Sequence, residues 1–99
     1  MEYIVVVRGK LKGSAAEAGK AHDEIVSKVS QLGKSMGNTS HKAYLNAQDG
    51  SEFLAIDFWD NMDGIQKLYS DPNLASEFAK MFDGQPEVTI WSDSGWLQF

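Results

Sequence analysis

The amino-acid sequence predicts an α+β fold with the element order β-α-β-β-α-β. Three observations lead to this prediction. The chain opens and closes on β-rich runs, "YIVVVRGKL" and "EVTIW". Two further strand-like runs in the middle of the chain are joined by "QDG", which is typical of a hairpin loop. Two other stretches repeat apolar residues every three or four positions, as a helix with one buried face does.

The first strand is predicted over residues 2–11, and "KGS" ends it. Ser14 and Glu17 have the spacing of a capping box, so a helix is expected to begin there. Gly33 marks the expected end of this helix. Its apolar face includes one histidine and consists of Ala15, Ala18, His22, Ile25, Val29 and Leu32.

The middle of the chain is predicted to form a loop and then a hairpin. Residues 33–40 are rich in Gly, Ser and Asn, which predicts the loop. The two strands of the hairpin are predicted over 40–47 and 51–59. After them, Asp60 is expected to cap a short helix over 61–69.

The last third of the chain restarts the second helix and ends in a strand. Asp71 is followed by Pro72, and a proline at the first helical position loses no hydrogen bond. A last strand is predicted from Glu87 to the end of the chain, broken near "DSG". The apolar face of the restarted helix consists of Leu74, Phe78, Met81 and Phe82.

This order of elements is the ferredoxin-like pattern, an antiparallel sheet with both helices on one face. The helices cover only that face, yet the first and third strands carry apolar residues on both faces. Monomers seldom leave an apolar face of this size open. We therefore expect a homodimer in which the open sheet faces pack together as a dimeric α/β barrel, with a cavity between them.

The stretch "FLAIDFWD" places Asp57 between Ile56 and Phe58, where burying an ionised carboxylate is costly. We expect this acid to face the cavity between the subunits. Its partner depends on the register of the hairpin, which two loop lengths leave open. A two-residue turn would place Lys42 opposite Asp57 and form a salt bridge. A three-residue "QDG" loop would place His41 there instead and form a His–Asp dyad.

Composition and charge exclude several classes of function. The 99 residues suffice for one domain, expected over 1–99. The chain has no cysteine, which excludes disulfides and thiolate chemistry. Its net charge of −5 and scattered basic residues argue against a nucleic-acid partner. We see no signal peptide and no run that could span a membrane, so we expect a cytoplasmic protein.

The sequence carries no motif for a metal or an organic cofactor, and we expect neither. The segment "GKLKGS" lacks the glycine pattern of a phosphate-binding loop, and no flavin or nicotinamide fingerprint is present. The two histidines are far apart in the sequence and do not form a metal-binding motif.

The segments "FLAIDFWDNMDGIQKLYSDP" and "PEVTIWSDSGW" resemble the dimeric α/β-barrel superfamily, and most closely its antibiotic-biosynthesis-monooxygenase-like domains. The most recognisable feature is a strand that ends in Trp59-Asp60 and leads into a short helix. The resemblance covers nearly the whole chain. It implies one of several functions: cofactor-free oxygenation of polyphenols, haem breakdown, lactone isomerisation, ring cyclisation or ligand binding.

Haem breakdown is disfavoured among these functions. The haem-degrading branch resembles this chain at Trp59, but it also uses an asparagine on the first strand and a histidine on the last helix. This chain has no asparagine in its first strand and no histidine in residues 72–82.

The candidate site centres on the two histidines, because only histidine titrates near neutral pH without a perturbed pKa. His41 is the predicted base, Asp57 its orienting acid and His22 the reserve base. The predicted function is a monooxygenase, or a related isomerase or cyclase, acting on a flat, mainly apolar polyphenol or polyketide. The alternative is a non-catalytic small-molecule-binding or stress-related homodimer, in which Asp57 pairs with Lys42. The residues predicted to contact the substrate are Tyr44, Trp59, Trp91 and Asn38.

Overall fold

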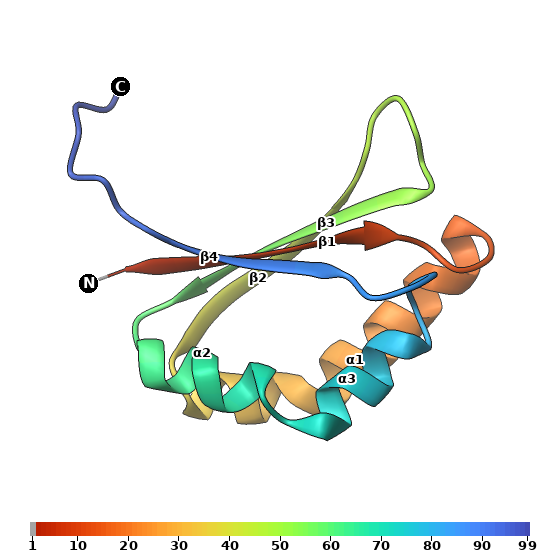
Figure 1. Ribbon diagram of the computed structural model, residues 1–99, viewed down its shortest axis with the longest axis horizontal. Helices are drawn as coiled ribbons and strands as arrows, with labels where there is room; N and C mark the ends of the chain where they lie inside the picture. Colours follow the sequence, from red (N-terminus) through yellow and green to blue (C-terminus); the bar gives the residue numbers. More distant parts are fainter. Residues whose placement is uncertain (1) are drawn as a thin grey trace.

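The computed structural model describes residues 2–99 and has an α+β fold with a four-stranded antiparallel sheet. The elements are β1 (Tyr3–Lys10), α1 (Ala15–Ser35), β2 (Asn38–Leu45), β3 (Glu52–Trp59), α2 (Met62–Tyr69), α3 (Pro72–Ala79) and β4 (Glu87–Ser92). The strands lie in the order β2-β3-β1-β4. All three helices lie on one side of the sheet and leave the other side bare (Figure 1). The predicted ferredoxin-like fold is therefore confirmed.

The core lies between the helices and one face of the sheet. Side chains alternate along β1 and β3, so every second residue of these central strands points towards the helices. Trp59, at the end of β3, is only 1% exposed. The inward residues of these two strands and the buried residues of α2 belong to one apolar cluster: Val5, Val7, Phe53 and Ala55 from the strands, and Ile65 and Leu68 from the helix.

The capping box predicted at the start of α1 is present. The Ser14 side chain accepts a hydrogen bond from the backbone N–H of Glu17, and the Glu17 side chain accepts one from the backbone of Ser14. The helix continues to Ser35, two residues past Gly33. Its end is set by Met36, whose N–H donates to the carbonyl of Gly33 at 3.0 Å.

The predicted loop over 33–40 is too long, because β2 begins at Asn38. The Asn38 side-chain amide donates to the carbonyl of Phe58 at 2.9 Å and holds the start of the strand in place. Asn38 pairs with Trp59 and Ser40 pairs with Phe58, so the register shifts by one residue between them. Sequence composition does not reveal such a bulge, because its hydrogen bonds run to a strand far along the chain.

The predicted cap at Asp60 is wrong by one residue. Asn61 is the N-cap of α2, and its side chain accepts hydrogen bonds from the N–H groups of Asp63 and Gly64. The backbone N–H of Asp60 donates instead to the carbonyl of Gly37 at 3.0 Å. Asp60 therefore belongs to the turn that joins β3 to α2, not to the helix itself.

The second predicted helix consists of two separate helices, α2 and α3. The Asp71 side chain accepts from the N–H of Asn73 and starts α3 with Pro72 at its first position, as predicted.

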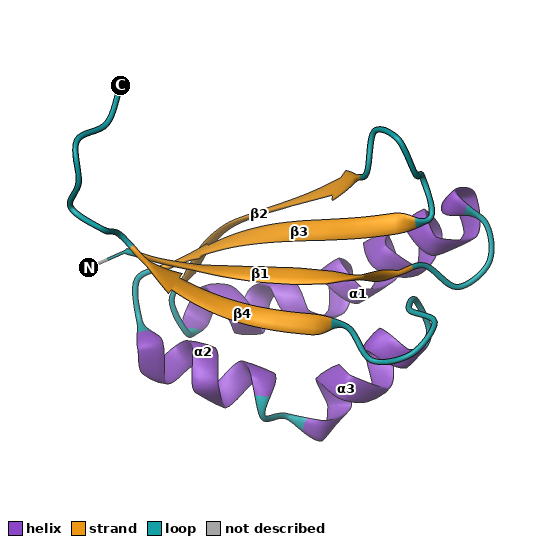
Figure 2. Ribbon diagram, turned by 45° about the horizontal axis from the view of Figure 1, so that its top comes forward, coloured by secondary structure: helices purple, strands orange, loops and turns teal. Residues whose placement is uncertain are grey.

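The predicted last strand is too long, because β4 ends at Ser92 opposite Tyr3, where β1 begins. Residues 93–99 have no neighbouring strand and lead away from the sheet (Figure 2). Within residues 2–99, no helix is both long and apolar enough to cross a bilayer.

Candidate active site

The hairpin adopts the register that places His41 of β2 opposite Asp57 of β3. This is the register predicted for the longer of the two loops considered, although the strands end earlier than predicted and residues 46–51 join them. Lys42 pairs with Ile56 and belongs to the other face of the sheet. Residues directly opposite each other in antiparallel strands have side chains on the same face. His41 and Asp57 therefore meet, and Nδ1 of His41 is hydrogen-bonded to Oδ1 of Asp57.

Asp57 faces the helices, so the expectation that it looks out between two subunits is wrong. It is only 7% exposed, and its neighbour across the sheet in β1 is the fully buried Val5. Alternation along β3 places Asp57 on the same face as Trp59, which lies in the core. The acid borders a cavity of about 90 Å³ between the sheet and the helix layer.

The wall of this cavity is mainly apolar, with a few polar groups gathered at one side. Its apolar part includes Ile25, Phe53, Ala55, Leu74, Phe78 and Phe82. This combination of an apolar lining with a few convergent polar groups is typical of a small-molecule site.

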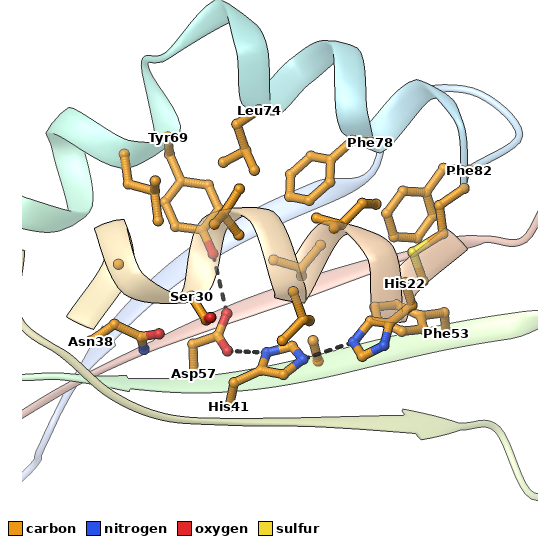
Figure 3. Close-up of a pocket in the computed structure, with 18 of the residues that line it drawn as sticks. His22, Ser30, Asn38, His41, Phe53, Asp57, Tyr69, Leu74, Phe78 and Phe82 are labelled. Carbon is orange, nitrogen blue, oxygen red and sulfur yellow. Dashed lines mark hydrogen bonds and ion pairs between the residues drawn. The ribbon is translucent and has the colours of Figure 1, made fainter. Parts of the chain in front are cut away.

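Four side chains from four different elements form one hydrogen-bonded chain along the cavity (Figure 3). Nε2 of His22, on α1, lies 2.8 Å from Nε2 of His41, on β2. His41 bonds Asp57 through its other ring nitrogen. The hydroxyl of Tyr69, from α2, donates to Oδ2 of Asp57 at 3.2 Å. Both carboxylate oxygens of the buried acid are thus hydrogen-bonded, which explains how an ionised group is tolerated there.

Asp57 also determines how its two partners titrate. Its hydrogen bond and its negative charge raise the pKa of His41, and burial of the imidazole opposes this only in part. Burial, together with the charge of Asp57, raises the pKa of Tyr69 well above its ordinary value. Tyr69 therefore remains a neutral hydrogen-bond donor at any physiological pH, whereas His41 can hold a proton more firmly than a free imidazole.

Trp59 supplies an unused hydrogen-bond donor. Its indole Nε1–H has no partner among the residues that the structure describes, although the side chain is buried in the cavity wall. A buried donor without a partner costs about 1–3 kcal/mol. An oxygen atom of a bound molecule could remove this cost. Asn38 also lines the cavity, but its NH2 group is occupied by the carbonyls of Ser40 and Phe58.

The structure brings together some of the predicted site residues but not all of them. His22, His41, Asp57, Trp59 and Asn38 line the cavity. The other two predicted contact residues, Tyr44 and Trp91, are exposed and do not line it.

Tyr44 and Trp91 belong to the bare face of the sheet. Tyr44 pairs with Leu54 of β3, and Trp91 pairs with Ile4 of β1, so both lie on the face turned away from the helices. The ammonium group of Lys42 sits 5.3 Å from the centre of the Tyr44 ring. The aromatic character of these residues indicated a binding surface, but not which face of the sheet they would occupy.

Sequence reasoning missed Tyr69. The signal for it was its helical spacing, because Ile65, Leu68 and Tyr69 repeat at three- and four-residue steps and share the inward face of α2. Its hydroxyl could have been expected to reach a polar partner, since a buried tyrosine usually finds one.

A second hollow lies next to the cavity. A groove of about 560 Å³ runs between α3 and β4 and shares Tyr69, Leu74, Phe78 and Phe82 with the cavity wall. These four side chains separate the two spaces.

Among residues 2–99 there is no cluster of three or more His, Cys, Asp or Glu side chains that could hold a metal ion.

Comparison with known proteins identifies the fold. No protein-family model matches the chain, and no curated protein matches it in sequence. Several solved structures match it in shape. SnoaB, a cofactor-independent oxygenase from Streptomyces nogalater, superposes in a variant form with a TM-score of 0.76 at 15% identity, over 97% of this chain and 96% of that one. The ActVA-Orf6 monooxygenase of Streptomyces coelicolor, solved with the ligand Nanaomycin D, gives a TM-score of 0.71 at 16% identity, over 97% and 90%.

A third match is the putative antibiotic biosynthesis monooxygenase from Bordetella bronchiseptica, with a TM-score of 0.76 at 8% identity, over 93% of this chain and 96% of that one. Identities this low establish a shared fold and not a shared activity. The resemblance inferred from the sequence is confirmed at that level: the chain has the fold of the antibiotic-biosynthesis-monooxygenase-like domains.

Proposed function

We propose that this protein is a monooxygenase-like enzyme that acts without an organic cofactor on a flat, mainly apolar and weakly acidic small molecule of the polyphenol or polyketide type. The observation that carries the proposal is the network of His41 and Tyr69 around the buried Asp57 in the wall of an apolar cavity. The fold supports it, because SnoaB is a cofactor-independent oxygenase and ActVA-Orf6 is a monooxygenase solved with a ligand.

The proposed chemistry begins with removal of a proton from the substrate by His41. Asp57 fixes the imidazole through Nδ1, so Nε2 is the nitrogen that takes the proton. The resulting carbanion gives an electron to O2, and recombination forms a carbon–oxygen bond. Where a CH2 group becomes a carbonyl, one oxygen atom enters the product and the other leaves as water with the two hydrogens. The substrate supplies all four electrons, so no external reductant is needed.

One neutral donor is free to meet the negative charge that forms on the substrate oxygen, the Trp59 indole N–H, which has no protein partner within residues 2–99. The Tyr69 hydroxyl stays protonated, but its single O–H is donated to Asp57. Fixed donors in an apolar surrounding stabilise a developing anion more strongly than water does.

The size of the cavity limits what can bind without a structural change. A volume of about 90 Å³ lies well below the 300–1,000 Å³ usual for drug-sized ligands. The adjoining groove of about 560 Å³ supplies the missing space once the side chains between them move. We therefore propose that a polycyclic substrate enters from the α3–β4 side and displaces Phe78, which is only half-buried.

We also propose that the protein works as a homodimer joined through the bare face of the sheet. Ile4, Val6, Leu54, Ile56 and Phe58 are partly exposed there, with Tyr44 and Trp91 beside them. A continuous apolar face of this kind is typical of a protein–protein interface. Tyr44 and Trp91 then serve as interface residues and not as substrate contacts.

A panel of compounds tests the ligand class. Thermal unfolding is followed with polycyclic phenols, hydroxyquinones, haem and fatty acids, with no metal or cofactor added. A ligand at about a hundred times its Kd adds roughly 2.7 kcal/mol to the free energy of unfolding. We expect the phenols or hydroxyquinones to raise the unfolding temperature, and one 18O atom to appear in the product under 18O2. A rise in unfolding temperature with haem alone, or binding without oxygen incorporation, would contradict the proposal.

A further inference from the structure

His22 and His41 form a pair that the chemistry above uses only in part. Their rings are inclined by 22° and their centres lie 5.0 Å apart, while the two Nε2 atoms are 2.8 Å apart. The distance between the ring centres exceeds the distance between the Nε2 atoms by about twice the radius of an imidazole ring. The rings therefore point their Nε2 atoms at each other and do not stack face to face, so the contact is a hydrogen bond between nitrogens. Each outer nitrogen, Nδ1, meets a carboxylate: Asp57 for His41, and Asp23, at 3.0 Å, for His22.

The hydrogen-bonded row Asp23–His22–His41–Asp57 needs a definite number of protons. It contains three contacts, and its two end groups are carboxylates, which only accept hydrogen bonds when ionised. Three contacts need three protons, but two neutral imidazoles bring only two. A third proton completes the chain. A fourth would set two N–H groups against each other at 2.8 Å. Three protons therefore satisfy all three contacts, one more than two neutral imidazoles carry.

The two ends of the chain lie in different surroundings. Asp57 is buried in the cavity wall, whereas the Asp23 side chain is 84% exposed on the surface of α1. The His22 side chain, 19% exposed, lies between them. Tyr69 of α2 also lines the cavity and bonds to Asp57. Tyr44 of β2 lines a separate pocket that His22 also borders. The residues that α1 and α3 otherwise contribute to the cavity wall carry no charge.

We propose that His22 is a proton-relay residue, which passes the proton collected by His41 to Asp23 and the solvent. This rests on the proposed function, because it requires His41 to act as a base. Both nitrogens of His41 are occupied in the structure, so a substrate that gives its proton to Nε2 first takes the place of His22 there.

The relay balances proton by proton. The pair begins with three protons, and His22 takes the shared one when the substrate displaces it, so His41 is left neutral with its Nδ1–H on Asp57. The displaced His22 releases one proton through Asp23 to the solvent and keeps the other on Nδ1. His41 takes the substrate proton at Nε2 and becomes an imidazolium. When the product departs, the free Nε2 of His22 returns to this proton, so the pair again holds three protons after one has entered from the substrate and one has left to the solvent.

The pair can be observed directly, without any substrate. In protein labelled with 15N at histidine, we expect a coupling through the hydrogen bond between the two Nε2 nuclei. His22→Gln, which keeps a donor near Nε2 but cannot relay a proton, should lose it. Glu24→Gln, an exposed change on the same turn of α1, should keep it. Two histidines that titrate independently in the wild type, with no coupling, would overturn the proposal.

Kinetics then test the relay itself with a phenolic substrate from the panel. In His22→Gln we expect kcat to fall by about tenfold with little change in kcat/KM, because the slow step follows chemistry. Imidazole buffer should restore the rate by carrying the proton in place of His22. A loss of kcat that imidazole does not restore would reject the relay and leave the oxygenase standing. A wild type that oxidises no compound would reject the proposed function, while the NMR result would still stand.

Discussion

At the scale of single residues, Asp57 organises the site. It is a buried acid whose two oxygens are held by His41 and Tyr69, and it determines the hydrogen-bonding direction of both. The sequence alone could identify it, because an acid within an apolar strand needs a reason. The sequence could not show that Asp57 faces the helices, since both faces of β3 are apolar and alternation alone does not say which face is covered.

Replacing Asp57 with asparagine should lower the pKa of His41, because the charge and the strong hydrogen bond that raise it are lost. Histidine titration followed by NMR measures this directly. Ser51→Ala, on the hairpin loop and outside the cavity lining, is a control that should leave the pKa of His41 unchanged.

Asp57→Asn should also make the free energy of unfolding less dependent on pH. A histidine whose pKa is raised by folding stabilises the protein below the unfolded pKa, near 6.5, and this contribution disappears as the pH rises through the folded value. The free energy of unfolding of wild type should therefore exceed that of Asp57→Asn most at about pH 6, and the difference should shrink towards pH 9. Urea titrations at several pH values measure it. A difference that grows with pH would contradict the assignment.

At the scale of secondary-structure elements, local signals were sufficient where the hydrogen bonds are local. The capping box at Ser14 and the Asp71–Pro72 start of α3 depend on residues three positions apart or fewer, and both were predicted. The start of β2 and the cap of α2 were missed, because Asn38 bonds to β3 and Asp60 bonds to Gly37. Only the folded chain brings these partners together.

Asn61→Ala should lower the free energy of unfolding by about 1 kcal/mol, the usual effect of removing an N-cap. Its side chain accepts from two N–H groups of the first turn of α2, which would be left without a protein partner. Asp60→Ala is the matched comparison and should change stability by no more than about 0.5 kcal/mol, because the exposed Asp60 side chain caps nothing. Chemical denaturation measures both. Equal losses would show that Asp60 shares the capping role.

Gly64→Ala should destabilise the protein by about 1–3 kcal/mol, because an added Cβ would run into the carbonyl oxygen of Met36 at the end of α1. This contact fixes α2 against α1 beside the cavity. Gly19→Ala, in open space on α1, should instead stabilise by up to about 1 kcal/mol through helix propensity. If Gly64→Ala is as stable as wild type, α2 does not pack as closely on α1 as the structure shows.

At the scale of the whole molecule, the order of elements was enough to predict the α+β fold. The same order predicted that the helices would cover only one face of the sheet. The site was predicted less fully. The His41–Asp57 pairing depended on a register that the sequence left open, and the meeting of His22 with His41 depends on how α1 crosses β2. Distances across the fold of this kind cannot be obtained from spacing along the chain.

The proposed homodimer gives a prediction at this scale. Light scattering coupled to size exclusion should report twice the mass of one chain for the wild type. Ile56→Lys places a charge in the centre of the bare face and should shift the protein towards monomer while circular dichroism remains unchanged. Lys20→Gln, on the exposed side of α1, should remain dimeric. A monomeric wild type at micromolar concentration would contradict the dimer.

The most direct test of the central claim is oxygen uptake with a phenolic or hydroxyquinone substrate, in buffer that contains a chelator and no cofactor. Wild type should consume oxygen with saturable kinetics, and His41→Gln should lose about a hundredfold or more in kcat, as expected for removal of a general base. Glu24→Gln should match the wild type. Wild-type uptake no faster than buffer, or an undiminished rate in His41→Gln, would contradict the assignment of this cavity as a base-catalysed oxygenation site.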